Sequence, residues 1–189
     1  MPEKLIIISA PSGAGKTTII KEILNSGIDL EFSISACSRK IRAGEQNAVD
    51  YYFLSAEEFR KKIENNEFLE WEEVYKNHYY GTLLSELTRI WEKGSNVLVE
   101  ADVYGGINIK NKYGDKALSI FIRPPSIEKL EERLLKRSTD SKESIQTRVA
   151  KAKEEIDNAG KFDVVVVNED LSKAVEESKN VILKFINSD

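Results

Sequence analysis

Residues 4–18 read KLIIISAPSGAGKTT, an apolar run followed by a glycine-containing loop that ends in a lysine and two threonines. The run from Leu5 to Ile8 carries no charge and predicts a strand of a parallel sheet that is buried on both faces. Gly13 and Gly15 permit backbone conformations in which successive N–H groups converge on phosphate oxygens at the start of a helix. The stretch therefore predicts a strand, a phosphate-binding loop and a helix, in that order.

The end of this loop supplies side chains for a nucleotide. Lys16 would reach the β and γ phosphates, and Thr17 would hold Mg²⁺ through its hydroxyl. The general pattern GxxxxGK[ST] has a glycine where this chain has Ala10, which adds only a methyl group. A chance Gly-Lys-Thr turn between a core strand and a helix is the alternative, and the order of strand, loop and helix disfavours it.

The composition excludes several classes of protein. The chain has 189 residues, 41% of them hydrophobic and 32% charged, which is typical of one globular domain with a sizeable core. A formal net charge of −4 provides no basic surface for nucleic acid or for an anionic membrane. The single cysteine, Cys37, excludes an internal disulfide framework. We expect no signal peptide, no membrane span and a cytoplasmic location.

Strands alternate with helices along the chain, which predicts an α/β protein whose core is a three-layer parallel sheet. Ser55 and Glu58 form a capping box ahead of one of the helices. Strands are expected at 5–8, 32–35, 49–54, 68–74, 78–82, 96–101, 116–122 and, as a last buried strand, 163–167; helices are expected at about 15–25, 55–65, 84–94, 126–135 and 171–185.

We expect a single domain over 1–189, with its core in residues 1–32, 84–135 and 158–189. Residues 33–83 form an inserted mixed α/β lobe. Residues 136–157 are dense in charge and poor in apolar anchors, which predicts a mobile helical lid. A solvated helical hairpin is the alternative for this last segment.

The inserted lobe offers a second anion site. Arg39 and Arg42 lie three residues apart in a loop, and guanidinium groups bind phosphate oxygens bidentately. Tyr51 and Tyr80 could add phenolic donors. Solvated surface arginines and core tyrosines are the alternatives for these residues taken singly.

Two acidic residues stand at informative places. Glu70 lies beside Trp71 among apolar residues, where an unpaired carboxylate would be costly to bury. Guanine offers two adjacent donors that one carboxylate can accept together, whereas adenine offers an acceptor at N1. Asp102 follows a core strand, at the edge where open parallel sheets bind ligands, or is simply a strand-end turn residue.

The charged segment contributes arginines that could close over a polyphosphate, where developing charge must be stabilised and water excluded. The candidates are Arg133, Arg137 and Arg148. Ordinary helix-surface ion pairs, such as Glu132 with Lys136, are the alternative for each. His78 and Cys37 show no metal-ligand spacing.

These pieces, in this order, resemble guanylate kinase of the bacterial type, a P-loop nucleoside monophosphate kinase, over essentially the full chain. The matching segments are SAPSGAGKT at 9–17, SACSRKIRAGE at 35–45, VDYYF at 49–53, EFLEW at 67–71, YYGT at 79–82, PPS at 124–126 and STDS at 138–141. Bacterial members of this family have alanine at the position of Ala10.

The resemblance implies a Mg²⁺-dependent transferase of purine nucleotide metabolism, which moves the γ-phosphoryl of ATP to GMP or dGMP. It implies that 33–83 binds GMP and 136–157 is the lid. The implied GMP contacts are Ser35, Arg39, Arg42, Tyr51, Glu70, Tyr80, Thr82 and Asp102. The implied ATP contacts are Ala10, Pro11, Ser12, Gly13, Ala14, Gly15, Lys16, Thr17, Thr18 and Asn168, with Thr17 also on Mg²⁺. The implied catalytic residues are Lys16, Arg42, Arg137 and Arg148.

The chain departs from the usual family pattern at a few positions: Cys37 and Ser38 replace two threonines, Ile41 a proline, Tyr104 a glutamine and Ser138 a glycine. None of these changes removes a charged group. Two other functions remain open. One is a non-catalytic guanylate-kinase-like module that binds phosphopeptides, although such modules tend to lack the loop lysine and lid arginines. The other is a kinase for a different nucleoside monophosphate.

Overall fold

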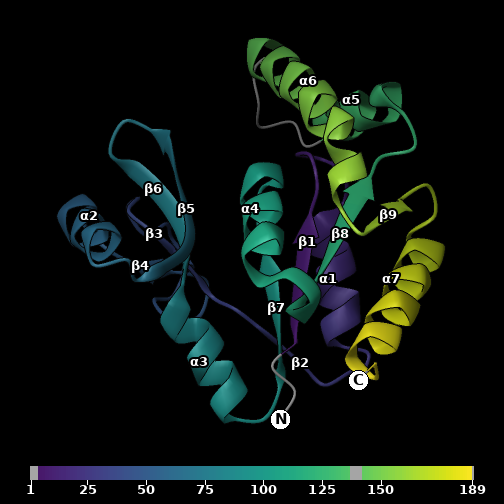
Figure 1. Ribbon diagram of the computed structural model, residues 1–189. Coiled ribbons are helices and arrows are strands. Elements are labelled where there is room, and N and C mark those ends of the chain that lie inside the picture. The colour runs from purple at the N-terminus through teal and green to yellow at the C-terminus, as the bar shows by residue number, and fades with distance from the viewer. Residues whose placement is uncertain (1–3, 137–141, 189) are drawn as a thin grey trace. The chain divides into compact units, whose positions relative to one another are not determined.

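The computed structural model describes residues 4–136 and 142–188 and has two sheets (Figure 1). One sheet has five strands in the order β2-β7-β1-β8-β9, and its pairs β2–β7 and β8–β9 are parallel. The other is a mixed sheet of four strands in the order β4-β3-β6-β5. The predicted α/β class, a parallel sheet with an inserted mixed α/β segment, is confirmed.

The chain divides into two compact units, one of residues 1–5 and 30–99 and the other of residues 6–29 and 100–189. The second unit carries most of β1 (Leu5–Ser9), then α1 (Lys16–Leu24), α4 (Val103–Tyr113), β8 (Ala117–Arg123), α5 (Ile127–Lys136), α6 (Lys142–Asp157), β9 (Val164–Val167) and α7 (Leu171–Ile186), with short 3-10 turns at Gly114–Lys116 and Ala159–Lys161.

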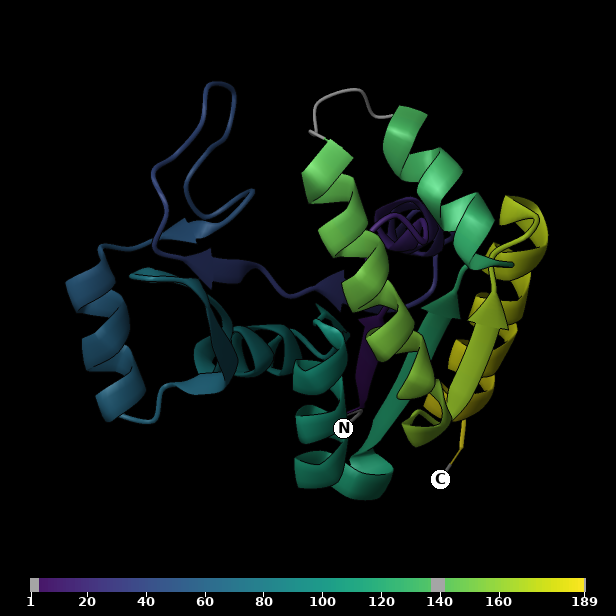
Figure 2. The ribbon, with the colours of Figure 1, turned by 90° about the horizontal axis from the view of Figure 1, so that it is seen from above.

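The core of this unit lies around β1 and β8. Every residue of β1 is buried, as the uncharged run predicted for a strand covered on both faces. Helix α1 packs beside α7, and α4 packs on β8 (Figure 1). Val103, Phe121 and Phe162 form a buried cluster between α4, β8 and the turn before β9. Helices α5 and α6 lie side by side, as Figure 2 also shows.

The first unit contains β2 (Leu30–Phe32), β3 (Ser35–Cys37), β4 (Tyr52–Phe53), α2 (Ala56–Glu64), β5 (Phe68–Tyr75), β6 (His78–Leu83), α3 (Leu84–Glu92) and most of β7 (Asn96–Glu100). Helix α2 covers one face of the mixed sheet. Its fully buried Phe59 stacks on Phe68 at 4.3 Å and on Tyr79 at 5.3 Å between ring centroids. The predicted capping box of Ser55 and Glu58 begins this helix.

Several predicted elements differ in the structure. Helix α4 was not predicted, because two adjacent glycines weaken its apolar pattern, and its first turn is capped by Asp102. The expected strand at 32–35 is the end of β2 and the start of β3, which belong to different sheets. The strand expected at 49–54 is only Tyr52–Phe53, because the chain before it turns.

The last strand was predicted to be buried, and this is wrong. Strand β9 is at the edge of its sheet, so Val164 and Val165 are half-buried and Val167 is 45% exposed. Leu171, the first residue of the closing helix, is exposed, and the buried positions of α7 are Ala174, Ser178 and Ile182. An edge strand has a neighbour on only one side, so its side chains are less covered.

The charged segment forms helix α6, which has more apolar anchoring than its composition indicated. Ile145 and Ala152 are buried in it. The mobility expected of this segment stays a prediction. Among the described residues, none of the helices has the length and apolar character needed to cross a membrane.

Candidate functional site: a phosphate-binding loop and a base-reading row

The loop between β1 and α1 has the backbone that anion binding requires. Gly13 and Gly15 have φ of +90° and +95°, a region that residues with a side chain rarely adopt. Gly15 is the N-cap of α1, and a glycine has no side-chain oxygen with which to cap the first N–H groups of the helix. These N–H groups, together with the positive end of the helix dipole, make a site for phosphate.

Lys16 is held against the carboxyl end of β7. Its Nζ donates to the carbonyl of Ala101 at 3.2 Å and pairs with Glu100 Oε1 at 3.3 Å. The lysine side chain is 17% exposed, so the charge is near the surface of its unit. Glu100 was not among the predicted site residues, and its position at the end of a core strand is the signal that could have found it.

Asp102 follows Glu100 by two residues and caps α4. Its Oδ1 accepts from the N–H of Gly105 at 2.5 Å, and its carbonyl accepts from the Ser9 hydroxyl at 3.0 Å. A Cβ on Gly106 would lie 2.4 Å from Ser9 Oγ, so this glycine permits the close packing of α4 on the end of β1. Asp102 is therefore a helix cap, beside the loop that Lys16 ends, and its predicted contact with GMP stays a prediction.

The side chains of Asn168 and Arg133 hold the backbone of the loop. The buried Asn168 donates from Nδ2 to the carbonyl of Ala14 at 2.7 Å. Arg133 donates from Nη2 to the carbonyl of Asn168 at 2.9 Å and from Nη1 to that of Ala14 at 3.4 Å. A Cβ on Gly15 would lie 2.3 Å from Asn168 Nδ2. The structure thus brings Asn168 to the loop, and it directs Arg133 to backbone carbonyls.

Helix α6 brings an arginine and a carboxylate to the same unit. Arg148 Nη2 donates to the hydroxyl of Ser12, which is in the loop. Arg137 lies outside the described residues. Glu155 is 7% exposed, and burial raises the pKa of its carboxyl, with Lys151 Nζ 3.9 Å away as a weak opposing charge.

The mixed sheet aligns three of the predicted GMP contacts, which the family resemblance places on the base. Thr82 on β6 is opposite Ser35 on β3 and opposite Glu70 on β5. Residues directly opposite in antiparallel strands point to the same face, so the three side chains form one row across the sheet. We call Ser35, Thr82 and Glu70 the base-reading row, after the contact with the guanine base that is predicted for them. The Thr82 hydroxyl donates to Glu70 Oε1 at 2.9 Å, which fixes the carboxylate within the row.

Trp71 does not supply the apolar surroundings expected for Glu70, because it points to the opposite face of β5 and is 46% exposed. Glu70 itself is half-buried. Its carboxylate has a protein partner in Thr82, which comes from a different strand, and its predicted contact with guanine stays a prediction.

A cationic and aromatic cluster lies next to the row. Tyr80 is two residues before Thr82 on β6, and its ring meets that of Tyr51 edge-on at 6.1 Å between centroids. The Arg39 guanidinium lies over Tyr51, 5.0 Å from the ring centroid. These three side chains, with the row, bring together the predicted GMP contacts of the first unit except Arg42.

Arg39 already has an anionic partner in the structure. Its guanidinium donates to both carboxylate oxygens of Glu45, at 2.7 and 2.6 Å. The Arg42 backbone N–H donates to the same carboxylate at 2.8 Å, whereas the Arg42 side chain is exposed. These bonds lower the pKa of Glu45 to about 2 and raise that of Arg39. Glu45 was missed as a site residue, although it is the one acidic residue of the basic segment 38–45.

Magnesium fits this site as a companion of phosphate oxygens. Within residues 4–136 and 142–188, the structure contains no cluster of three or more His, Cys, Asp or Glu side chains that could hold a metal ion. Thr17 is exposed at the first turn of α1, next to Lys16. Mg²⁺ is commonly held by one or two protein oxygens plus substrate phosphates, so a single hydroxyl beside the phosphate site is a suitable donor set.

Comparison with known proteins gives one consistent family. The family model for guanylate kinase matches residues 2–185. The guanylate kinase of Bacteroides thetaiotaomicron is 54% identical over 189 residues, which cover all of this chain and 93% of that protein. The guanylate kinase of Porphyromonas gingivalis is 56% identical over 184 residues, with 97% and 98% of the two chains covered.

A solved structure agrees with these sequence matches. The crystal structure of guanylate kinase from Anaplasma phagocytophilum superposes with a TM-score of 0.77 at 28% identity, covering 98% of this chain and 87% of that one. Because the family model matches residues 2–185 and relatives of this family are 54–56% identical along nearly the whole length, the chain belongs to the guanylate kinase family.

Proposed function

We propose that the protein transfers the γ-phosphoryl group of Mg·ATP to the phosphate of GMP or dGMP, giving ADP and the corresponding diphosphate. The observation that carries this proposal is the base-reading row beside the cluster of Arg39, Tyr51 and Tyr80. A carboxylate that can accept two donors, next to a guanidinium and two phenols, suits a guanine nucleotide with one phosphate group.

The phosphate-binding loop is the proposed ATP site. The N–H groups at the start of α1 would cradle the phosphates of ATP, and Lys16 would exchange Glu100 and the Ala101 carbonyl for phosphate oxygens. Ser12 and Arg148 already meet at this loop, so Arg148 is placed to act on the polyphosphate. We assign ATP contacts to residues 10–18 and to Asn168. The contact of Asn168 would lie near the adenine base.

The acceptor needs orientation more than activation. An oxygen of the GMP phosphate attacks the γ-phosphorus, a new P–O bond forms, and the bond to the oxygen bridging the β-phosphate breaks as ADP leaves. Bound through Thr17 and phosphate oxygens, Mg²⁺ would supply positive charge against the charge of the transferred group. Lys16, Arg42, Arg148 and Arg137, the last outside the described residues, are the proposed cations that position and stabilise this group.

The proposal assigns a different function to each segment of the chain. Residues 33–83 would bind GMP, residues 136–157 would act as the lid that excludes water, and the remaining residues would form the core. Asp102, which belongs to the other unit, is retained as a GMP contact. A cytoplasmic location is proposed as well, since the substrates are metabolites of the cytoplasm and Cys37 is a buried free thiol.

The alternative of a non-catalytic phosphopeptide module has less support. The relatives matched over nearly the full chain carry the name of the enzyme, and the chain keeps the loop lysine and Arg148. Retained catalytic cations would have no purpose in a module that only binds phosphopeptides.

An ADP-release assay with GMP, dGMP, AMP, CMP and UMP as acceptors tests the proposal. We expect turnover with GMP and dGMP and little with the other three acceptors. Absence of turnover with every acceptor would overturn the enzymatic function. A preference for AMP over GMP would overturn the role of Glu70.

A further inference from the structure

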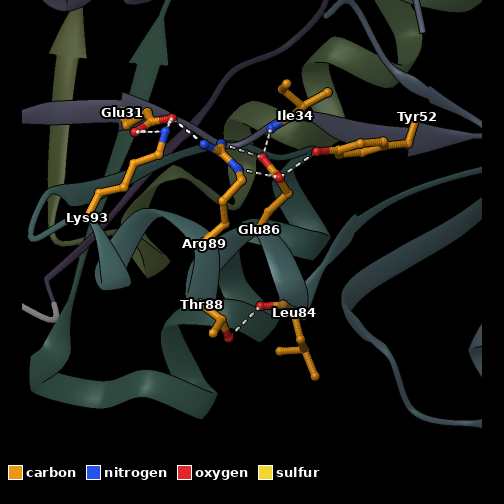
Figure 3. A network of polar contacts seen from close by, with 8 residues as sticks. All are labelled: Glu31, Ile34, Tyr52, Leu84, Glu86, Thr88, Arg89 and Lys93. Atoms are coloured by element: carbon orange, nitrogen blue, oxygen red, sulfur yellow. Dashed lines mark hydrogen bonds and ion pairs between the residues drawn. The ribbon is translucent and has the colours of Figure 1, made fainter. Parts of the chain in front are cut away.

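Glu86 is an acidic residue of the first unit that the proposed chemistry does not use, and it is almost completely buried. It lies in the first turn of α3 and is 2% exposed. Four donors reach its two carboxylate oxygens. Arg89 donates from Nε at 2.7 Å and from Nη2 at 2.8 Å, and the Ile34 N–H and the Tyr52 hydroxyl each donate at 2.8 Å (Figure 3).

These bonds keep the carboxylate ionised inside the protein. Burial alone would raise the pKa of Glu86, but the bonds from Arg89, Ile34 and Tyr52 outweigh burial and lower it. Such a group holds its donors in a defined geometry, because each of them would otherwise lose a charge-assisted hydrogen bond.

Two of the four donors are immediate neighbours of proposed GMP contacts. Ile34 precedes Ser35, the β3 member of the base-reading row. Tyr52 follows Tyr51, which lies under Arg39 in the cationic cluster. Strands β3 and β4 also pair with each other, with Ala36 opposite Tyr52. One carboxylate thus fixes the chain next to a residue for the base and next to a residue for the phosphate.

The other side of the network anchors the carboxylate to the adjoining strand. Arg89 Nη1 also donates to Glu31 Oε1 on β2, and Lys93 Nζ pairs with the same Glu31 at 2.8 Å (Figure 3). Helix α3 is therefore tied to β2 before the chain leaves for β3, and to the Ile34 N–H just before β3 begins. The connection at residues 33 and 34 is therefore held at its start by the bond of Arg89 to Glu31 and at its end by the bond of Ile34 to Glu86.

We propose that Glu86 is a positioning residue for the acceptor nucleotide: through Ile34 and Tyr52 it sets the places of Ser35 and Tyr51, and it does not touch the nucleotide itself. The inference rests on the proposed GMP site. It predicts an effect on GMP binding that is absent from ATP binding, whereas a merely structural role would lower stability without separating the two substrates.

The test compares three single variants in the full chain. Glu86→Gln keeps the shape but removes the charge, and Tyr52→Phe deletes one hydroxyl, so the second stays informative if the first folds poorly. Thr88→Ala is the matched control, because the Thr88 hydroxyl donates to the Leu84 carbonyl of its own helix, at 3.4 Å, away from the network. The readouts are the KM for GMP, the KM for ATP, kcat, the midpoint of thermal unfolding, and GMP affinity by calorimetry.

We expect Tyr52→Phe to raise the KM and Kd for GMP about three- to tenfold and Glu86→Gln to raise them more than tenfold, in line with the loss of one or more bonds to a charged group. The KM for ATP should stay within about twofold, and Thr88→Ala should leave both substrates unchanged. Unchanged GMP affinity in Tyr52→Phe, or equal effects on GMP and ATP, would overturn the inference alone. If the unaltered chain neither bound nor phosphorylated GMP, both the proposed function and this inference would be overturned.

Discussion

The carboxylate of Glu70 is the residue on which guanine selectivity should depend, and Glu70→Gln is the sharpest perturbation of it. The substitution keeps the size of the side chain and its place in the base-reading row, opposite Thr82. A carboxylate offers acceptors only, so it can take a hydrogen bond from Thr82 at 2.9 Å and still face the two donors of guanine with acceptors. A glutamine amide has one acceptor and one donor group, so in either orientation an N–H group opposes one of the two guanine donors.

The expected loss follows from these contacts. One hydrogen bond to a charged group contributes about 1.5–3 kcal/mol, and an opposed, unsatisfied donor costs about 1–3 kcal/mol more. The sum of about 2.5–6 kcal/mol corresponds to a fall of about two to four orders of magnitude in kcat/KM for GMP. The proposed ATP site is on the other unit, so we expect the KM for ATP to change little.

The assay compares GMP with inosine monophosphate, whose base keeps N1–H but lacks the exocyclic amine. Glu70→Gln should reduce the preference for GMP over inosine monophosphate at least about tenfold, because one glutamine oxygen suffices for N1–H alone. Thr82→Val is the control: it removes the hydroxyl but leaves both carboxylate oxygens, so selectivity should persist while turnover falls by about tenfold or less. A GMP preference unchanged by Glu70→Gln would refute the assignment of this carboxylate to the base.

Three further predictions concern the loop and stability. Lys16→Ala should lower turnover about 100-fold or more while leaving GMP affinity by calorimetry intact, and loss of GMP binding would contradict the split of substrates between the units. Gly15→Ala should lower the free energy of unfolding by about 1–3 kcal/mol, as measured by thermal unfolding. Gly94→Ala is the control and should lower it less, because both glycines have positive φ but only at Gly15 would the added Cβ lie 2.3 Å from an amide nitrogen. Burial alone would raise the pKa of Asp163, but hydrogen bonds from Ser119 and a lysine lower it. Its stabilising effect should therefore be complete above about pH 4 and decline as the pH falls through the lowered pKa; Asp163→Asn should flatten this dependence in acid unfolding curves.

Local signals carried much of the fold. The capping box of Ser55 and Glu58 and the uncharged run at Leu5 are statements about a few neighbouring residues, and the structure confirms both. Where tertiary context decides, the sequence was less informative. Helix α4 has adjacent glycines that weaken its pattern, and the exposure of Val167 depends on β9 being an edge strand.

Some residues of the candidate site could likewise be predicted from the sequence, and others could not. The order of motifs is enough to nominate Lys16, Arg39, Glu70 and Asn168, because a phosphate site or a base site needs particular chemical groups. The partners of these groups come from distant positions. Glu100 reaches Lys16 across a separation of 84 residues, and no periodicity in the sequence connects them. Glu45, six residues from Arg39, could have been suspected only from its charge.

The sequence by itself determined a strand, a glycine loop and a helix that begins at a lysine, since these depend on backbone freedom and side-chain chemistry within residues 4–18. From them it predicted a phosphate site. It also determined which side chains could read a guanine nucleotide. Only the tertiary structure decided that Ser35, Thr82 and Glu70 form one row. It also decided that Glu86 accepts hydrogen bonds from Ile34 and Tyr52, which lie next to two proposed GMP contacts. The physical reason is that strand register and buried hydrogen bonds join residues far apart in the chain, and their positions follow from packing of the whole unit.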